Sequence, residues 1–599
     1  MVTLQVMTGL FPRAGTARVV GRQPVLLLFR ALATVLVLFA VNPGLAQQPR
    51  LQVNGAPPDL EQNIRALVQL PGQSCDATPR SLSRFLPDVR QQVNRAGRAL
   101  GYYFLTEQSR FIAGERCWQL DISVDAGEPV MIAAVNVSVA DHRDLFEETL
   151  ASLPVEAGDQ LNHALYERTK SELSSRAVEL GFFSARFART ELRVDLQNNT
   201  ADVQIEFEPG DRFRFGEVNL EPVDGLSEDF IRRYLNFESG GFYSASSLID
   251  LRNVLNDSFY FSTVNVTPAI DQAVDQQVPV QVGLQLRPRR VYSTGVGVTT
   301  DIGPRVRLDY EDRYLNRRGH RFDVQSSASP IQQMIDLDYS IPWNDPATER
   351  LIFSGGLLHE DNDTFSVRTT KYGVTYTFMN RWNWRQEYFI NVQHDDSTLL
   401  DTNTRETSDM LIPGVSLTRT RADDALYPQR GWKLSARLSG ASDTLLSTET
   451  FLQFYLNGKF INPLGPGRVM VKFEAGTTVT DEIRNLPASI QFFTGGDQSV
   501  RGYKYQSLAP VNDSDEQTGG KHLLVAGIEY DFNILPSWKL AVFADAGNAF
   551  LSPDEPDLRK SVGIGVRWLS PLGPVRLDLA SGLDNDNAFR LHLTMGPDL

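Results

Sequence analysis

The chain has 599 residues, 42% of them hydrophobic and 22% charged, and a formal net charge of -15. This length predicts several domains rather than one hydrophobic core, and the acidic balance argues against a nucleic-acid-binding protein. The body of the chain lacks an apolar run of about 18 residues, which excludes a bundle of membrane helices but not a membrane barrel, whose strands carry only an alternating pattern.

Residues 1–46 have the composition of a secretory targeting segment. A basic stretch without acidic residues precedes an apolar core at residues 31–41 and the small-residue sequence Gly44-Leu45-Ala46, which predicts cleavage before Gln47. An N-terminal anchor helix is the alternative, although the apolar run is short for one. Removal of the segment takes away four arginines and no acid, so the net charge falls from -15 to -19.

Two cysteines, Cys75 and Cys117, lie in the first part of the exported chain. In an oxidising compartment a lone pair of cysteines usually forms a disulfide, so we expect these two to be joined. Two buried free thiols are the alternative.

One pattern then occurs three times, at intervals of about 80 residues. A helix ends at a small residue followed by aromatics, and an alternating strand follows and ends at a turn. The helix ends lie at residues 100–103, 180–183 and 257–260, and the strands at residues 120–127, 202–210 and 280–288. With apolar residues at helical spacing in 165–178 and 248–255, each unit is predicted as strand, helix, helix, strand, strand.

After about residue 290 only strand-like segments follow. Segments such as 305–310, 563–568, 575–579 and 589–595 alternate apolar with charged or polar residues, which puts the apolar side chains on one face. A soluble sandwich would bury that face in its core, whereas a membrane barrel would turn it to lipid and turn the charges to a wet lumen.

Short turns rich in Pro, Gly and Asn alternate with longer polar loops, which is typical of an outer-membrane barrel. The segments add up to about sixteen antiparallel strands, an even number that returns both barrel ends to the same side. The longer loops are expected at residues 359–364, 394–408, 485–520, 551–560 and 584–587.

The longest of these loops contains a glycine-rich segment around one arginine. Glycines permit positive φ and close backbone approach, so the tip can fold inward and offer a guanidinium to a partner. The segment reads Thr494-Gly495-Gly496-Asp497-Gln498-Ser499-Val500-Arg501-Gly502-Tyr503. It resembles the VRGY/F loop, here Val500 to Tyr503, of the BamA/TamA superfamily of outer-membrane assembly factors.

Other parts of the chain resemble the same superfamily. Residues 293–305, 417–431 and 563–580 are similar to its barrel motifs, residues 542–548 resemble its F-x-D-x-G strand, and the three repeats resemble POTRA domains. The final residue Leu599 departs from the aromatic ending usual in bacterial barrels but resembles the TamA type. The resemblance implies a signal peptide at 1–46, POTRA domains at 47–128, 129–210 and 211–289, and a barrel of the bacterial surface antigen type at 290–599. An unrelated tandem of small α+β domains is the alternative for the repeats.

The function that the resemblance implies is assembly and insertion of outer-membrane proteins, autotransporters among them. It places the barrel in the outer membrane and the POTRA domains in the periplasm. The implied partners are unfolded clients, outer-membrane lipid and a TamB-like inner-membrane-anchored protein bound at the first POTRA domain. No cofactor and no enzymatic activity are implied.

The resemblance also assigns a partner to the loop arginine. In the superfamily this arginine meets the aspartate of the F-x-D-x-G strand, which corresponds to Asp545, and Glu529 is a second candidate acceptor. A guanidinium inside a partly dehydrated barrel is costly unless it is paired. We therefore expect Arg501 to pair with Asp545 and pin the loop; a bridge that only stabilises the barrel is the alternative.

The first and last strands must meet to close the barrel. The candidate seam residues are Gly295 and Gly297 in the first strand and Leu591 and Leu593 in the last. Glycine weakens a strand, so we expect the seam to open sideways and to let an incoming strand add to its edge. Glycines that only relieve crowding inside the barrel are the alternative.

Competing functions are less well supported by the pattern. The histidines lack metal-ligand spacing, and the segments at residues 359–363 and 394–396 fit exposed polar loops better than cation sites. A two-partner-secretion translocation pore would carry two POTRA units and a plug helix, and a BamA-type general insertase would carry five units. Three units therefore favour the TamA-like alternative.

Overall fold

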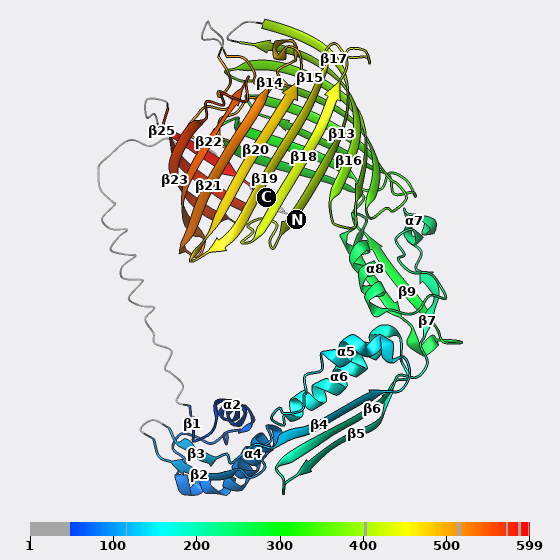
Figure 1. Cartoon of the computed structure of the whole chain (residues 1–599), viewed down its shortest axis with the longest axis vertical. Coiled ribbons are helices and arrows are strands. Elements are labelled where there is room, and N and C mark those ends of the chain that lie inside the picture. The colour runs from blue at the N-terminus through cyan, green and yellow to red at the C-terminus, as the bar shows by residue number, and fades with distance from the viewer. Residues whose placement is uncertain are drawn as a thin grey trace, which may run out of the picture. The chain divides into compact units, whose positions relative to one another are not determined.

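The computed structural model describes residues 48–114, 117–400, 404–511, 517–570, 573–584, 589–596 and 598 (Figure 1). The predicted targeting segment and its cleavage site lie outside these residues. The chain divides into two compact units, one made of residues up to 177 with 184–210 and the other of residues 178–183 with 211–599. No helix in the described part of the chain is both long and apolar enough to cross a membrane.

The first unit holds two α+β repeats with the predicted element order. Repeat 1 comprises β1 (Arg50–Asn54), α2 (Pro58–Leu67), α3 (Pro79–Leu82), η1 (Ser83–Phe85), α4 (Leu86–Ala99), β2 (Thr106–Ile112) and β3 (Gln119–Asp125). Repeat 2 comprises β4 (Met131–Val139), η2 (Arg143–Phe146), α5 (Glu147–Ala151), α6 (His163–Leu180), β5 (Arg186–Asp195) and β6 (Thr200–Glu208). The sheet orders are β1-β3-β2 and β4-β6-β5, so the last strand of each repeat is central.

The core of repeat 1 joins its helices to the central strand, as the alternating pattern predicts. Leu60 of α2 and Leu120 of β3 are fully buried in one apolar cluster. The expected disulfide between Cys75 and Cys117 is present, and Cys117 packs against this cluster beside the buried Trp118. The disulfide prediction is therefore confirmed.

The second unit begins with a third repeat, which completes the predicted set of three. It comprises β7 (Arg214–Leu220), α7 (Glu228–Arg232), α8 (Ala245–Asp257), β8 (Phe261–Pro268), η3 (Ile270–Gln272) and β9 (Gln277–Leu286), with sheet order β7-β9-β8. Its Tyr260 hydroxyl donates to Gly319 O at 2.6 Å, in a turn of the following barrel. Burial raises the pKa of Tyr260 to about 12, so the hydroxyl keeps its proton and remains a donor.

Sixteen strands follow, and each pairs antiparallel with its neighbours in chain order from β10 to β25 (Figure 1). They are β10 (Arg290–Thr299), β11 (Gly303–Asp312), β12 (Arg321–Ala328), β13 (Gln332–Pro342), β14 (Glu349–Asp361), β15 (Phe365–Met379), β16 (Arg385–Leu399), β17 (Thr404–Ala422), β18 (Gly431–Ala441), β19 (Phe451–Leu464), β20 (Gly467–Val479), β21 (His522–Leu535), β22 (Trp538–Phe550), β23 (Arg559–Ser570), β24 (Gly573–Gly582) and β25 (Phe589–Met595). The short helix η4 (Ile483–Asn485) follows β20. The predicted strand number is confirmed.

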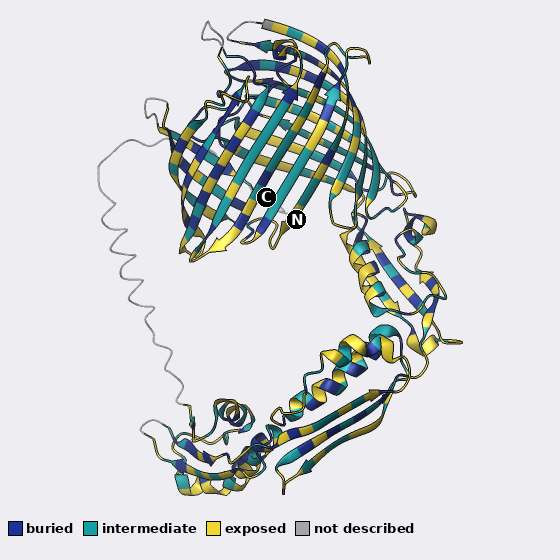
Figure 2. Cartoon of the chain, viewed as in Figure 1, coloured by how far each residue is buried: buried dark blue, intermediate teal, exposed yellow. Residues whose placement is uncertain are grey.

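Burial in this sheet is the reverse of that in a soluble protein. Along β22 the charged Lys539 and Asp545 are 4% and 2% exposed, whereas Leu540 and Val542 are 37% and 49% exposed. Figure 2 shows exposed and less exposed residues alternating along the strands. Apolar side chains that face outward over a polar interior fit a barrel surrounded by lipid, and a soluble sandwich would show the opposite arrangement.

One predicted loop is largely strand and a second is half strand. β16 continues to Leu399 and β17 begins at Thr404, so most of the described residues in 394–408 belong to the sheet, and β14 continues to Asp361, which takes in half of 359–364. These segments carry polar residues on both faces, and the missing apolar face concealed the strand pattern. The connection of residues 480–521, between β20 and β21, is the long loop that the sequence predicts.

Candidate functional site

The long connection carries the VRGY/F-like segment, and this segment lies against the inner face of the barrel. Val500 is fully buried, and Tyr503 donates its hydroxyl to Lys560 O at 3.1 Å. Gly502 has a φ of +94°, and a Cβ there would lie 2.8 Å from the backbone nitrogen of Gly582. Only glycine combines this conformation with this close approach, so the motif sequence follows from the packing.

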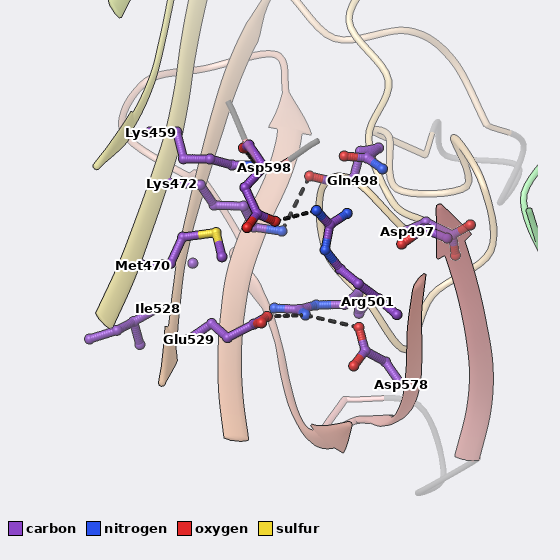
Figure 3. A pocket seen from close by; sticks show the side chains of 13 residues that line it. Lys459, Met470, Lys472, Asp497, Gln498, Arg501, Ile528, Glu529, Asp578 and Asp598 are labelled. Atoms are coloured by element: carbon purple, nitrogen blue, oxygen red, sulfur yellow. Dashed lines mark hydrogen bonds and ion pairs between the residues drawn. The ribbon is translucent and has the colours of Figure 1, made fainter. Parts of the chain in front are cut away.

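The side chain of Arg501 enters a pocket of carboxylates. Its Nε donates to Asp545 Oδ2 at 2.7 Å and its Nη2 to Asp545 Oδ1 at 3.1 Å, so the expected ion pair is present and bidentate. Its Nη1 also donates to Glu529 at 2.7 Å and to Asp578 at 3.1 Å (Figure 3). The guanidinium lies 3.4 Å from the centre of the Phe543 ring. The sequence named two of these three acceptors and missed Asp578.

Two further cations complete a balanced network. Arg567 donates to Glu529 at 2.8 Å and to Asp578 at 2.5 Å, and Lys472 Nζ lies 3.5 Å from Asp545. Together with Arg501 of the loop, three cations face three carboxylates, and the other five members of this network lie on β20 to β24. Such a network offsets the loss of hydration only if its members are mutually paired, which these distances satisfy.

The electrostatic effect on Arg501 follows from this arrangement. Arg501 is 6% exposed. Burial by itself would lower its pKa, but the carboxylates of Asp545, Glu529 and Asp578 reverse that effect and raise its pKa. The guanidinium therefore stays charged, and its contacts act as a fixed anchor for the loop.

Small residues make room for these charges on the inner face. A Cβ added to Gly527 would lie 2.5 Å from Asp545 Oδ1, and one added to Gly565 would lie 2.5 Å from Arg567 Nη1.

The signal for Asp578 was also present in the sequence: alternation through residues 575–579 places it on the polar face, although nothing local assigns its partner.

A second charged layer holds the end of the chain. Arg468 Nη2 donates to Asp598 Oδ2 at 2.6 Å, and its Nε donates to Asp531 Oδ2 at 2.8 Å. Lys459 donates to Asp598 O at 2.6 Å, and Arg576 also pairs with the Asp598 carboxylate. Asp598, which follows β25, is therefore held in the barrel interior.

The seam between β10 and β25 is short. Among the described residues, no strand ladder joins the two, although every other pair of neighbours from β10 to β25 forms one. Thr300 N–H donates to Leu593 O at 3.3 Å, and Leu593 N–H donates to Thr300 Oγ1 at 3.2 Å. Extending this antiparallel register by two residues places Met595 beside Val298, and both residues line one opening.

The predicted seam residues occupy different places along this edge. Leu593 contacts Thr300, just beyond the end of β10, while Leu591 is 57% exposed on the outer face. Gly295 and Gly297 line the opening with Met595. A Cβ at Gly297 would meet nothing within 4 Å, so crowding does not explain the glycine there.

These features define an outer-membrane β-barrel protein whose POTRA-like domains lie in the periplasm. Family models agree along the chain: the Omp85 superfamily domain matches residues 315–598, the POTRA domain TamA domain 1 matches residues 50–126, and the surface antigen variable number repeat, a POTRA model, matches residues 143–210. The barrel thus carries an Omp85 superfamily domain over residues 315–598, in agreement with the resemblance found in the sequence.

Individual relatives are distant. The outer membrane protein assembly factor BamA of Nitratidesulfovibrio vulgaris is 21% identical over 440 residues, which cover 70% of this chain and 55% of that protein. The BamA of Neisseria meningitidis serogroup B is 22% identical over 492 residues, which cover 69% of this chain and 60% of that protein. The chain thus spans about half to three fifths of these relatives.

A solved structure shares the fold. The crystal structure of BamA from Haemophilus ducreyi lacking POTRA domains 1–3 superposes with a TM-score of 0.64 at 16% identity, covering 78% of this chain and 99% of that one.

Proposed function

We propose that this protein assembles β-barrel clients into the outer membrane by adding their strands to the free edge of β10. One observation carries the proposal. In the described chain β10 lacks a strand partner along most of the edge that faces β25, whereas β11 to β24 are paired along both edges. Tyr292 and Val296 on this strand are 75% and 82% exposed. Unpaired backbone is very costly in lipid, so an incoming strand gains hydrogen bonds by pairing there.

The POTRA domains are proposed to deliver the client. In each of the three sheets the central strand is the last one, which leaves β2, β5 and β8 as edge strands. Edge strands present rows of backbone donors and acceptors to extended chains. The match of repeat 1 to a TamA-type POTRA domain supports the finer proposal that clients include autotransporters and that a TamB-like protein binds there. The proposed role requires no cofactor and no enzymatic step.

The seam provides the sharpest test. We expect a Val298→Cys/Met595→Cys pair to form a disulfide that holds the seam closed, and insertion of newly made barrel proteins into the outer membrane to fall under oxidising conditions. A reductant should restore insertion, and each single cysteine variant should behave like the parent. Insertion that continues unchanged while the seam is fully cross-linked would refute the proposal.

Depletion of the protein identifies its clients. Quantitative proteomics of the outer membrane should show loss of a subset of β-rich surface proteins; a loss confined to autotransporters supports the TamA-like form. A general loss of barrels would instead favour a BamA-type insertase. A two-partner-secretion type of translocation pore is the other alternative, and a large steady single-channel conductance would favour it over an insertase.

A further inference from the structure

The long loop also contacts the barrel through Asp497, which lies four residues before Arg501 and next to the seam between β10 and β25. The carboxylate of Asp497 is buried, at 9% exposure of the residue. This carboxylate accepts hydrogen bonds from Thr300 Oγ1 at 2.7 Å and from the backbone N–H of Asp301 at 3.3 Å. The backbone N–H of Asp497 donates to Asp301 Oδ2 at 2.7 Å. These three contacts join the loop to the turn that follows β10.

The same carboxylate also reaches the last strand. His592 of β25 hydrogen-bonds Asp497 Oδ1 through Nδ1, and Gly502 N–H donates to His592 Nε2 at 2.8 Å. Because Nε2 accepts a hydrogen bond, the proton of a neutral imidazole is on Nδ1 and is donated to Asp497. His592 is 4% exposed, so both ring nitrogens are used within the protein.

A bound cation is the obvious alternative for this cluster. Asp301, Asp497 and His592 each offer one ligand atom, and these atoms lie within 4.8 Å of one another. A metal ligand needs a free lone pair on the nitrogen that faces the ion, whereas Gly502 N–H directs the imidazole proton to that nitrogen. The hydrogen bonds therefore do not favour a metal site. They favour a cluster of polar contacts between Asp497 and the residues Thr300, Asp301 and His592, which we call the clasp.

The clasp accounts for how the short seam is held. The hydrogen bonds between Thr300 and Leu593 lie directly beside it, and below them the described residues of β10 and β25 form no ladder. Sheet pairing therefore contributes little to closure, and Asp497 touches both sides of the gap. Arg501, by contrast, is anchored on β21, β22 and β24, away from β10.

We propose that Asp497 is a positioning residue that holds the seam closed through Thr300, Asp301 and His592, and that releasing it opens the seam while Arg501 stays anchored. The loop is then fixed to the barrel at Arg501 and can detach from it at Asp497. The link to client insertion rests on the proposed function, whereas the clasp itself can be measured in the absence of any client.

Backbone geometry provides an independent handle on the clasp. Gly496 has a φ of +104°, and a Cβ there would lie 2.5 Å from Asp301 Oδ2. Gly496→Ala should therefore push the carboxylate of Asp301 away. Gly465→Ala is the matched control, because Gly465 also has a positive φ of +56° but an added Cβ would meet nothing within 4 Å.

The experiment measures seam closure in the full-length protein in client-free lipid vesicles. The readout is the rate at which a Val298→Cys/Met595→Cys pair forms a disulfide. Asp497→Ala should slow this rate about tenfold, the effect expected from losing charge-assisted hydrogen bonds. Thr300→Val and Gly496→Ala should also slow it. Resistance of the barrel to unfolding by heat in SDS should remain, because the Arg501 network is intact.

The control for Asp497 removes another carboxylate that binds the same loop. Asp363 pairs with Lys504 at 2.9 Å, and although both line the same pocket as Thr300 and His592, their side chains are 72% and 55% exposed. An exposed pair of this kind contributes little, so Asp363→Ala should slow cross-linking much less than Asp497→Ala does. Parental rates in Asp497→Ala, Thr300→Val and Gly496→Ala would overturn the clasp. If Asp497→Ala alone fails to fold, the other two variants decide. A looser seam with unchanged client insertion would support the clasp and refute the proposed function.

Discussion

The wall formed by β20 to β24 and the edge formed by β10 and β25 belong to one sheet but are stabilised differently. In the wall each strand is paired on both sides, and the interior holds a network of three cations and three carboxylates around Arg501. At the edge the strands share few hydrogen bonds, and a Cβ added to Gly295 or Gly297 of β10 would meet almost nothing. The wall is thus stabilised by strand pairing and by ion pairs to Arg501 of the loop, whereas closure of the edge depends on the hydrogen bonds of Asp497.

This contrast shows which interactions can distinguish one strand pair from another in a barrel that has apolar side chains outside and polar side chains inside. Apolar burial is available on the lipid side along the whole sheet, so it does not distinguish one strand pair from another. Specificity therefore comes from the polar interior, where buried charges must find partners. The wall concentrates ion pairs, whereas the edge has the few contacts of Asp497, so we expect the wall to be more rigid than the edge.

The largest effect is expected from removing the central cation of the wall. Arg501→Ala leaves Asp545, Glu529 and Asp578 short of one partner and should cost about 3–5 kcal/mol of barrel stability. Urea unfolding of the refolded barrel in lipid measures this cost. Arg559→Ala is the control, because its pair with Asp557 is partly exposed and should be worth less than about 1 kcal/mol. Equal effects of the two variants would contradict the network.

A charge swap between Arg501 and Asp545 should fail to restore this loss. In the double variant Arg501→Asp/Asp545→Arg, the new arginine would lie close to Lys472, whose Nζ is 3.5 Å from the present carboxylate. The new aspartate would lie among the carboxylates of Glu529 and Asp578. Recovery of stability in the swap, measured by the same unfolding transition, would show that the pair acts alone.

A smaller effect should follow from filling space in the wall. Gly527→Ala would place a Cβ 2.5 Å from Asp545 Oδ1 and also 2.5 Å from Lys472 Cε. Overpacking of this kind typically costs about 1–3 kcal/mol. The urea midpoint should fall, and the decrease should shrink when Lys472 is replaced by Ala, because the flexible side chain then no longer obstructs.

A glycine-to-alanine substitution at the edge should instead raise the stability of the barrel. A Cβ at Gly297 would meet nothing within 4 Å, so Gly297→Ala should stabilise by about 0.4–1 kcal/mol through a less flexible unfolded chain. If β10 must bend or separate during client insertion, the same variant should insert clients more slowly. Destabilisation of the barrel by Gly297→Ala would show that the seam is packed more tightly than the structure indicates.

The sequence predicted features that are local or periodic. Alternation predicted about sixteen strands and the polar interior, whereas the pairing of Arg501 with Asp545 across 44 residues was implied by the resemblance to a known superfamily. The Asp497–His592 contact, across 95 residues, depends on where the last strand lies against the loop, which no periodicity encodes. Leu593 was named as a seam residue, but its partner Thr300 was not, because strand register at a short seam is set by tertiary contacts. The strand ends beyond the apolar band were also missed.

The smallest expected effect is a pH dependence of seam closure. Burial and the neighbouring carboxylate of Asp497 raise the pKa of Asp301 to about 8. The closed clasp therefore holds a proton that an exposed aspartate, with a pKa near about 4, would release. Closure should be strongest at low pH and should weaken as the pH rises to about 8, above which it should level off.

Distances between spin labels at positions 298 and 595 report this weakening without any thiol titration. Asp301→Asn should abolish the pH dependence, because the amide stays neutral and can still donate to Asp497. Other titratable or charged groups also face this site, so the remaining slope in that variant measures their share; besides Asp497 they are Asp363, Tyr503, Lys504, Tyr505, Arg590 and His592. A slope unchanged by Asp301→Asn would assign the proton to one of these groups and leave the clasp dependent on geometry alone.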